Sequence, residues 1–365
     1  MPMLSLDHDK PTVLIVDDEP APRAALTQVL RQNFRILTAD SITAALALLN
    51  EHGVDLVTLD LRLPDGSGSE LLDEIKRRHG EVEVIMVTAY GTLQSAMECI
   101  RHGAAGFLLK PFNATELLTI SLQTSQKKRR LDLLRTALAD NPALWGAEPA
   151  CTDAWQGVME RYSTLVSEGA FQAAHGGEPS PLIQFVSDLL EAKERQLVNH
   201  GNRVSFYATL AAARLELSLP EQNVLSLGAL AHDLDLIHAP GTSVLQHESR
   251  CDGHRTDLGA RICRALGLPP GAVQIIALHH ERWDGTGFPF GLQGERIPLL
   301  TRLVSMAQTF DELTAEKPGT PPLSMASAID AIEGQAGTAF DPALTDVFCK
   351  TMRDQSPPAS SAGES

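Results

Sequence analysis

The stretch that decides the fold is Thr12–Glu19, TVLIVDDE. Five residues that are apolar or β-branched run directly into three acids. This is typical of a strand buried on both faces of a sheet, with polar groups at its carboxyl end. Pro20 and Pro22 come next, and proline favours the first turn of a helix, which we expect to extend to about Gln32. A buried strand followed at once by a helix indicates the first half of a βαβ unit.

The same order of strand and helix repeats as far as residue 124. Short apolar runs predict three further strands, at Val54–Leu59, Val82–Val87 and Gly106–Leu109. Amphipathic spacing predicts helices between them, over Ile42–Asn50, Gly68–Arg78 and Leu93–His102. Strands that alternate with helices predict a doubly wound parallel α/β sheet of the flavodoxin-like type within residues 11–124.

The carboxyl ends of these strands carry the first group of candidate site residues, which are Asp17, Asp18, Asp60, Thr88 and Lys110. In a doubly wound sheet these ends meet at one edge, where ligands bind. Three carboxylates held together repel one another, and a hard cation such as Mg²⁺ relieves that repulsion. A hydroxyl and an ammonium group beside them suit a phosphoryl group, so the pattern predicts phosphorylation of a carboxylate. A lone acid in such a place is usually a solvated loop residue, but five polar groups at successive strand ends argue against that alternative.

Four segments, VDDEP, LDLRLPDGSG, VTAYG and GFLLKPF, resemble the receiver domain of two-component response regulators, and the resemblance covers residues 11–124. It implies that Asp60 is the phosphoacceptor and that a sensor histidine kinase is the partner. It also implies a Mg²⁺ site formed by Asp17, Asp18, Asp60 and the main-chain carbonyl of Arg62. The residues implied to contact the phosphoryl group or to switch on phosphorylation are Lys110, Thr88 and Phe107.

The totals limit the classes of function. A length of 365 residues fits two domains, possibly three, each able to bury its own core. The net charge of −16 argues against general nucleic-acid binding, and no helix-turn-helix with basic recognition residues is visible, so we expect no direct DNA binding. Five cysteines without a CxxC pair, the absence of a signal peptide and the absence of an apolar run of about 18 residues predict a cytoplasmic protein without membrane contact.

We expect residues 125–181 to form a helical linker and residues 353–365 to form a disordered tail. Helices are predicted over Gln126–Leu138 and Asp153–Phe171, with proline-containing breaks between them. The KKRR cluster in the first of these helices is interpreted as a solvated helix face. No catalytic pattern lies in the linker, and its expected role is to couple the two domains or to form a homodimer.

Helical periodicity dominates residues 182–352 and predicts an all-α bundle. The predicted helices are Leu182–Leu197, Val204–Leu217, Glu221–Leu236, Asp257–Leu266, Ala272–His280, Leu299–Leu313 and Ser324–Ile332. The chemically informative residues of this region are His200, the pair His232-Asp233 and the pair His279-His280. An Asp in an apolar helix is costly to bury without a partner, and a neighbouring histidine with a cation would satisfy it. Taken alone, the pair also fits a helix-end histidine beside a locally bonded Asp.

The order H…HD…HHExWDGxGFP resembles the HD-GYP family of cyclic di-GMP phosphodiesterases over Arg195–Pro342, and its most specific piece is RWDGTGFP at residues 282–289. The resemblance implies an all-α HD-type helical domain that uses a metal centre to activate water against a phosphodiester. The metal is Fe or Mn by the same resemblance. The implied ligands are His200, His232, Asp233, His279 and His280.

The chain departs from the family at several of its positions. Asp235 and Leu236 stand where the family has Gly and Lys, Gln308 replaces a carboxylate ligand, and Arg255 replaces a ligand histidine. Fewer ligands predict one metal ion instead of a full cluster. The lost Lys and carboxylate predict weaker transition-state stabilisation, by roughly 3–4 kcal/mol for each electrostatic group removed.

Two functions follow, and the sequence leaves open whether the output domain is catalytic. In the first, a degenerate HD-GYP domain acts in cyclic di-GMP signalling through protein contacts, for example with a diguanylate cyclase (GGDEF) domain. Such contacts would involve the loop residues Asp284, Gly285, Gly287, Phe288 and Pro289. In the second, the domain is an active metal-dependent cyclic di-GMP phosphodiesterase regulated by receiver phosphorylation. Hydrolysis of another phosphoester is a third alternative.

Overall fold

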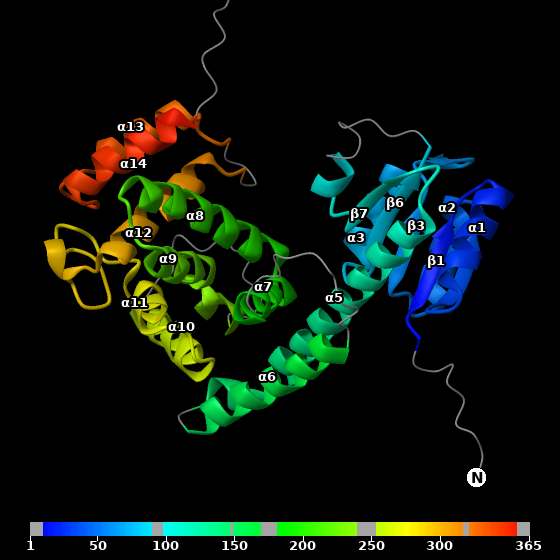
Figure 1. The fold of residues 1–365 in the computed structure, drawn as a ribbon, viewed down its shortest axis with the longest axis horizontal. Coiled ribbons are helices and arrows are strands. Elements are labelled where there is room, and N and C mark those ends of the chain that lie inside the picture. The colour runs from blue at the N-terminus through cyan, green and yellow to red at the C-terminus, as the bar shows by residue number, and fades with distance from the viewer. Residues whose placement is uncertain are drawn as a thin grey trace, which may run out of the picture. The chain divides into compact units, whose positions relative to one another are not determined.

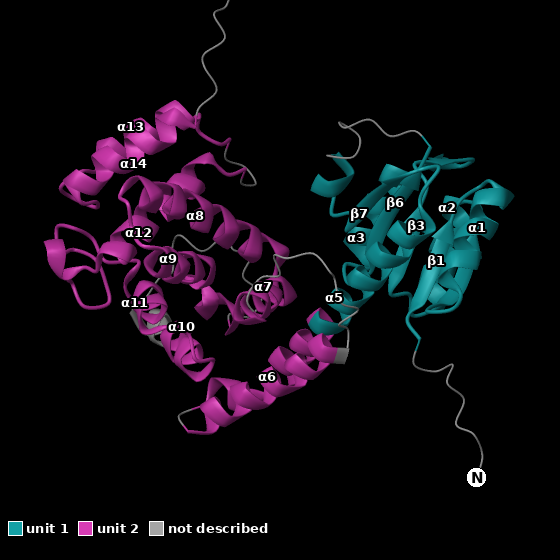
Figure 2. Ribbon diagram, viewed as in Figure 1, with its two compact units in different colours: residues 1–130 teal, residues 131–365 magenta. Residues whose placement is uncertain are grey.

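The computed structural model describes residues 10–89, 98–146, 149–168, 181–238, 253–316 and 321–355. Residues 1–130 form one compact unit and residues 131–365 form another (Figure 2). Each unit contains two clusters of buried apolar side chains that belong to it alone. No helix among the described residues has the length and apolar character needed to cross a membrane.

Unit 1 contains a five-stranded parallel sheet, which confirms the predicted fold class (Figure 1). The strand order is β2-β1-β3-β6-β7, with bounds Arg35–Ala39, Thr12–Val16, Leu56–Leu59, Glu83–Thr88 and Gly106–Leu109. β1, β3 and β6 are buried along their whole length. β2 was not among the predicted strands because it lies at an edge, where only Ala39 is buried, and so it lacks a continuous apolar run.

Helices cover both faces of this sheet. α1 (Pro20–Leu30) and α5 (Ala114–Asp140) contribute Leu26, Leu30 and Leu117 to the cluster on one face. α2 (Ile42–Glu51) and α3 (Gly68–Arg78) contribute to the cluster on the other face. A short hairpin of β4 (Arg62–Leu63) and β5 (Gly66–Ser67) follows β3 directly. The capping box that begins α3 fixes the end of this hairpin.

Unit 2 is helical, as predicted. Its elements are η1 Pro142–Trp145, α6 Ala150–Glu168, α7 Pro181–Lys193, α8 Arg195–Arg214, α9 Leu219–Ala231, η2 Leu234–His238, α10 Gly253–Ala265, α11 Pro270–Leu278, η4 Gly294–Arg296, α12 Leu299–Thr314, α13 Met325–Glu333 and α14 Pro342–Asp354. The predicted helix Leu182–Leu197 is interrupted, because Glu194 adopts an extended conformation between α7 and α8. α14 continues through Arg353 and Asp354, so the predicted tail cannot begin at residue 353; residues 356–365 lie outside the described ones.

The predicted linker is part of a packed core. α5 is one helix of 27 residues, so the predicted boundary after residue 124 falls inside it. Leu134 of α5 and Trp155 of α6 are buried in the same cluster as Phe185 of α7 and Leu234 of η2. The helices expected for the linker are therefore present, but they help to form the core that also holds the start of the HD-like region.

Close packing of α8 on α9 brings together two parts of the candidate site. At Gly201, the residue after His200, an added Cβ would lie 2.5 Å from the main-chain oxygen of Leu230. Real Cβ atoms do not approach that closely, so only glycine permits the observed distance between the helices. Because Leu230 lies two residues before His232, this contact sets how near the two histidines can come.

We predict that Gly201→Ala destabilises unit 2 by about 1–3 kcal/mol, because overpacking forces the two helices apart. Gly157→Ala in α6 is the matched control, since nothing lies within 4 Å of its added Cβ. A helical Gly→Ala change without a clash should stabilise by roughly 0.5–1 kcal/mol. Urea unfolding of both variants measures the difference; equal midpoints would contradict the proposed helix contact.

Candidate functional site

The structure brings together the predicted residues at the carboxyl ends of β1, β3 and β7. Carboxylate oxygens of Asp17, Asp18 and Asp60 all lie within 4.8 Å of one another. The Nζ atom of Lys110 lies 2.6 Å from Asp17 Oδ2 and 2.6 Å from Asp60 Oδ2. Burial disfavours the Lys110 ammonium, but its hydrogen bonds to the two carboxylates outweigh that effect and raise its pKa. The donor set is acidic oxygen only, which fits a hard divalent cation.

The remaining predicted receiver residues border this cluster. The Arg62 N–H group donates to Asp60 Oδ1 at 3.3 Å. Thr88 is fully buried at the end of β6, and Phe107 is half-buried in β7. The Lys110 N–H group donates to the Thr88 carbonyl at 2.8 Å, so the strand pairing itself places Lys110 beside Thr88. The switch role of Thr88 and Phe107 stays a prediction, and residues 90–97 lie outside the described ones.

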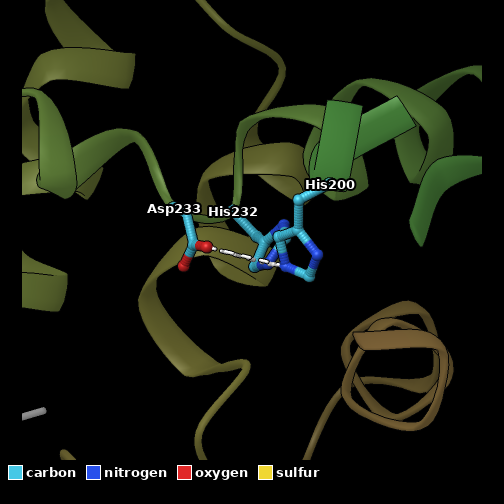
Figure 3. Close-up of side chains that lie close together, drawn as sticks. All are labelled: His200, His232 and Asp233. Atoms are coloured by element: carbon cyan, nitrogen blue, oxygen red, sulfur yellow. Dashed lines mark hydrogen bonds and ion pairs between the residues drawn. The ribbon is translucent and has the colours of Figure 1, made fainter. Parts of the chain in front are cut away.

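A second cluster lies in unit 2 and consists of His200 from α8, His232 at the end of α9, and Asp233. The two histidine Nε2 atoms lie 3.2 Å apart. Asp233 Oδ2 lies 3.7 Å from His200 Nε2 and 3.5 Å from His232 Nε2. Figure 3 shows the three side chains pointing toward one another. Both histidines are buried, so this geometry belongs to the interior of the helical unit.

The two predicted histidines at the end of α11 extend this cluster. The ring of His279 lies 5.2 Å from the ring of His232, and the ring of His280 lies 3.9 Å from that of His279. Nε2 of His279 is buried and has no hydrogen-bond partner among the described residues. Of the five predicted ligands, His200, His232 and Asp233 therefore meet directly, His279 adjoins them, and His280 lies one ring further out.

Hydrogen bonds to main-chain carbonyls fix the orientation of two of these imidazoles. Nδ1 of His232 donates to the carbonyl of Ala229 at 2.7 Å, and Nδ1 of His279 donates to the carbonyl of Ile276 at 3.0 Å. In the neutral rings Nε2 then carries the lone pair that a metal would take. Two such lone pairs facing each other at the distance seen for His200 and His232 require a proton or a metal ion between them.

Asp311 of α12 is a site residue that the sequence analysis missed. It is 1% exposed, and its Oδ2 accepts a hydrogen bond from His200 Nδ1 at 2.7 Å. Arg203 holds the same carboxylate through Nε at 2.6 Å and Nη2 at 2.9 Å. A carboxylate behind a ligating histidine fixes the ring and raises its basicity. The available signal was an Asp among the buried apolar residues of α12, three positions after Gln308.

The pKa shifts describe a site prepared for a cation. Burial lowers the pKa of His232 and lowers that of His279 well below its usual value. Burial also opposes protonation of His200, but the hydrogen bond that it donates to Asp311 and the charge of Asp233 raise its pKa overall. Burial alone would raise the pKa of Asp233, yet the surrounding histidines lower it. The neutral imidazoles of His232 and His279, the ionised Asp233 carboxylate and the unpartnered His279 Nε2 fit a divalent transition metal.

A cavity of about 800 Å³ borders this cluster. Among its lining residues are the positions where the chain departs from the family pattern, Asp235, Leu236 and Gln308. Gln308 Nε2 donates to Glu312 Oε1 at 2.9 Å, so the amide is engaged on its own helix. Arg203 and Arg282 are the cationic residues of the described lining. The side chain of Arg255 lies outside the described ones.

The loop of the predicted partner surface is folded back on the histidine pair. Asp284 accepts hydrogen bonds from Thr286 within the loop, and Gly285 has a φ of +81°, which favours glycine. The N–H groups of Trp283 and Asp284 donate to the carbonyls of Ala339 and Thr338. Phe288 is half-buried and lines the cavity, so this part of the loop faces the site.

Comparisons with known proteins find the same two parts. Residues 13–121 match the response regulator receiver domain family, and residues 184–344 match the HD domain family. The chain is 26% identical to a cyclic di-GMP phosphodiesterase of Thermotoga maritima, over 94% of this chain and 91% of the relative. It is 27% identical to the cyclic di-GMP phosphodiesterase response regulator RpfG of Xanthomonas campestris pv. campestris, over 93% and 87%. A probable cyclic di-GMP phosphodiesterase of Vibrio cholerae is also 27% identical, over 94% and 78%.

We predict that Asp311→Asn weakens metal binding in unit 2 by about 10–100-fold, because the amide no longer holds His200 as a charged acceptor. Asp346→Asn, in an exposed ion pair on α14, is the control and should bind as the parent does. Both changes are made in a parent carrying Asp17→Asn and Asp18→Asn, which removes the acidic cluster of unit 1. Titration with Mn²⁺ followed by electron paramagnetic resonance gives the affinity, and equal affinities in the two variants would exclude the supporting role of Asp311.

Proposed function

Because this chain belongs to the two-component response regulators that join an N-terminal receiver domain to a C-terminal HD domain, we propose that phosphorylation of Asp60 controls a metal-dependent phosphodiesterase in the HD domain. One observation carries the catalytic half of this proposal. His200, His232 and Asp233 converge inside unit 2 beside the unpartnered Nε2 of His279, and a cavity opens next to them. In a purely structural cluster each buried ring nitrogen is expected to have a hydrogen-bond partner.

The receiver half of the proposal concerns phosphoryl transfer. A sensor histidine kinase donates a phosphoryl group to Asp60, with Mg²⁺ held by Asp17, Asp18, Asp60 and the Arg62 carbonyl. The Lys110 ammonium, already 2.6 Å from Asp60, remains close enough to contact the phosphoryl oxygens. Thr88 and Phe107 change position in response. The four described cysteines form no disulfide bonds with one another, which suits the reducing cytoplasm.

The output half concerns hydrolysis of a phosphodiester. His200, His232, Asp233, His279 and His280 would hold one Fe or Mn ion, with His280 binding from the outer side of the site. When bound, such an ion lowers the pKa of water and polarises a phosphoryl oxygen. Asp311 and Arg203 keep the His200 ring in place, and the buried walls around His232 keep bulk water away from the ligands. The names of the relatives point to cyclic di-GMP as substrate, and hydrolysis of one of its phosphodiester bonds by one water gives a linear dinucleotide.

A second candidate function is protein contact without hydrolysis. Leu236 and Gln308 give the cavity no charge where a lysine and a carboxylate were expected, which favours a weakened catalyst. The loop residues Asp284, Gly285, Gly287, Phe288 and Pro289 would then bind a partner such as a diguanylate cyclase (GGDEF) domain. Main-chain bonds hold this loop to residues 338–339, so its shape would be ready for a partner.

Packed side chains within unit 2 form a route by which the receiver would control the metal site. α5 continues past unit 1 and leads into η1, where the Trp145 ring lies 4.4 Å from the ring of His238. His238 closes η2, the element that follows His232 and Asp233 directly. Leu134 of α5 shares a core cluster with residues of η2. A shift of α5 would therefore reach the metal ligands through packed side chains instead of a flexible connection.

We predict that the protein, purified without oxygen and supplied with Mn²⁺ or Fe²⁺, hydrolyses cyclic di-GMP and that Asp233→Asn lowers the rate about 10²–10³-fold. Asp330→Asn, an exposed acid on α13, should leave the rate unchanged. Linear dinucleotide is measured by chromatography. Equal rates for the parent and Asp233→Asn would overturn the catalytic proposal and leave protein contact as the function.

We also predict that Trp145→Ala reduces the response of hydrolysis to phosphorylation, because it removes an aromatic contact of roughly 0.5–1.5 kcal/mol between η1 and η2. Trp145→Phe keeps a ring against His238 and should retain most of the response. Rates are compared with and without acetyl phosphate, and Asp60→Asn shows the rate of a protein that cannot respond. A full response in Trp145→Ala would rule out this route.

A further inference from the structure

We propose that Phe288 is a positioning residue of the metal centre, which holds the imidazole of His280 in the orientation needed to face the metal. The proposal rests on the proposed function, since it takes the histidine cluster of unit 2 to bind a metal ion. It assigns to Phe288 a role inside the site, in place of the partner-surface role expected from the sequence.

The proposal rests on the contact between Phe288 and His280, which lies at the end of a continuous row of aromatic rings. Successive centroids lie 5.0 Å apart for His200 and His232, 5.2 Å for His232 and His279, and 3.9 Å for His279 and His280. The Phe288 ring then lies 4.7 Å from His280 with an interplanar angle of 29°, which is a stacked arrangement. His280 is thus enclosed between the ring of His279 and the ring of Phe288.

The position of Phe288 is fixed by its own main chain. Its N–H group donates to the carbonyl of His280 at 3.3 Å, so the loop turns back onto the residue that the ring covers. Gly287 makes this return possible, because an added Cβ would lie 2.3 Å from the nitrogen of Arg282 and 2.6 Å from the Cα of Glu281. A side chain at residue 287 would push the loop, and Phe288 with it, away from His280.

Glu281 fixes the far side of the same loop. Its side chain is 3% exposed, and its two carboxylate oxygens accept the N–H groups of Phe290 at 2.7 Å and Leu292 at 2.9 Å. A buried carboxylate that accepts hydrogen bonds from two main-chain N–H groups fixes the loop that carries them. Residues 281–292 therefore form a closed loop. Of its two phenylalanines, it is Phe288 whose ring points inward.

The two phenylalanines of this loop have different surroundings. Phe288 is half-buried and lines the cavity, whereas Phe290 is 70% exposed. If the loop served only as a partner surface, replacing either Phe288 or Phe290 by alanine should leave metal binding intact. If Phe288 positions His280, only its loss should matter, and Phe290 provides a control within the same loop.

The energetic consequence follows from the geometry of the ring. A stacked aromatic pair contributes roughly 0.5–1.5 kcal/mol beyond its buried area, and it restricts the rotation of the smaller ring. Loss of Phe288 would remove this restriction and widen the range of orientations that the His280 ring samples. Loss of groups that orient ligating side chains typically lowers metal affinity by about 10–100-fold.

The test compares Phe288→Ala, Phe288→Leu, Phe288→Tyr and Phe290→Ala in the full chain carrying Asp17→Asn and Asp18→Asn. Mn²⁺ affinity is measured by electron paramagnetic resonance. We expect Phe288→Ala and Phe288→Leu to bind Mn²⁺ about 10-fold more weakly or worse. Phe288→Tyr, which keeps the flat ring, and Phe290→Ala should remain within about twofold of the parent, well below the 10–100-fold loss expected when an orienting group is removed.

A second readout does not depend on the metal. The imidazole resonances of His280 in the metal-free protein should move in Phe288→Ala and not in Phe290→Ala, because only the first change removes a stacked ring. Parent-like Mn²⁺ affinity and unmoved His280 resonances in a folded Phe288→Ala protein would overturn the proposal. A parent protein that binds no Mn²⁺ at all would instead overturn the proposed function on which it rests.

Discussion

The carboxylate of Asp311 is the interaction on which the arrangement of the output site depends. It joins α12 to α8 by accepting hydrogen bonds from both His200 and Arg203 while almost completely buried. Burying a charge is costly unless it is paired, and here the pairing partners belong to the site itself. The bond to His200 Nδ1 turns the opposite nitrogen toward His232 and Asp233. The helical packing of unit 2 and the chemistry of its centre are therefore linked through one side chain.

Both described sites bring electron-rich ligand atoms together and are suited to a cation. In unit 1, the carboxylates of Asp17, Asp18 and Asp60 lie together, and the Lys110 ammonium contacts two of them, those of Asp17 and Asp60. In unit 2, two Nε2 atoms face each other beside Asp233. The first site offers oxygen atoms and suits a hard ion, while the second offers nitrogen and oxygen and suits a transition metal. The two halves of the proposed function thus rest on the same physical requirement, met with different ligands.

The parts of this arrangement that follow from local pattern were predicted, and those that depend on packing between distant segments were not. Asp60 and Lys110 were predicted to meet because the ends of parallel strands share an edge whatever the loops do. Asp311 was missed because its role appears only when α12 packs on α8, 108 to 111 residues away in sequence. The position of Phe288 beside His280 was not predicted because a Gly/Pro-rich loop gives no sign of the direction in which it folds. β2 was missed because an exposed edge strand has no apolar run.

The central claim is that unit 2 holds a metal ion between His200, His232 and Asp233. Anomalous diffraction at the manganese edge, from crystals of the full chain grown with Mn²⁺, tests it most directly because it locates each ion. We expect a peak within bonding distance of the Nε2 atoms of His200 and His232 and of the Asp233 carboxylate. A peak at the acidic cluster of unit 1 together with none beside these three residues would contradict it.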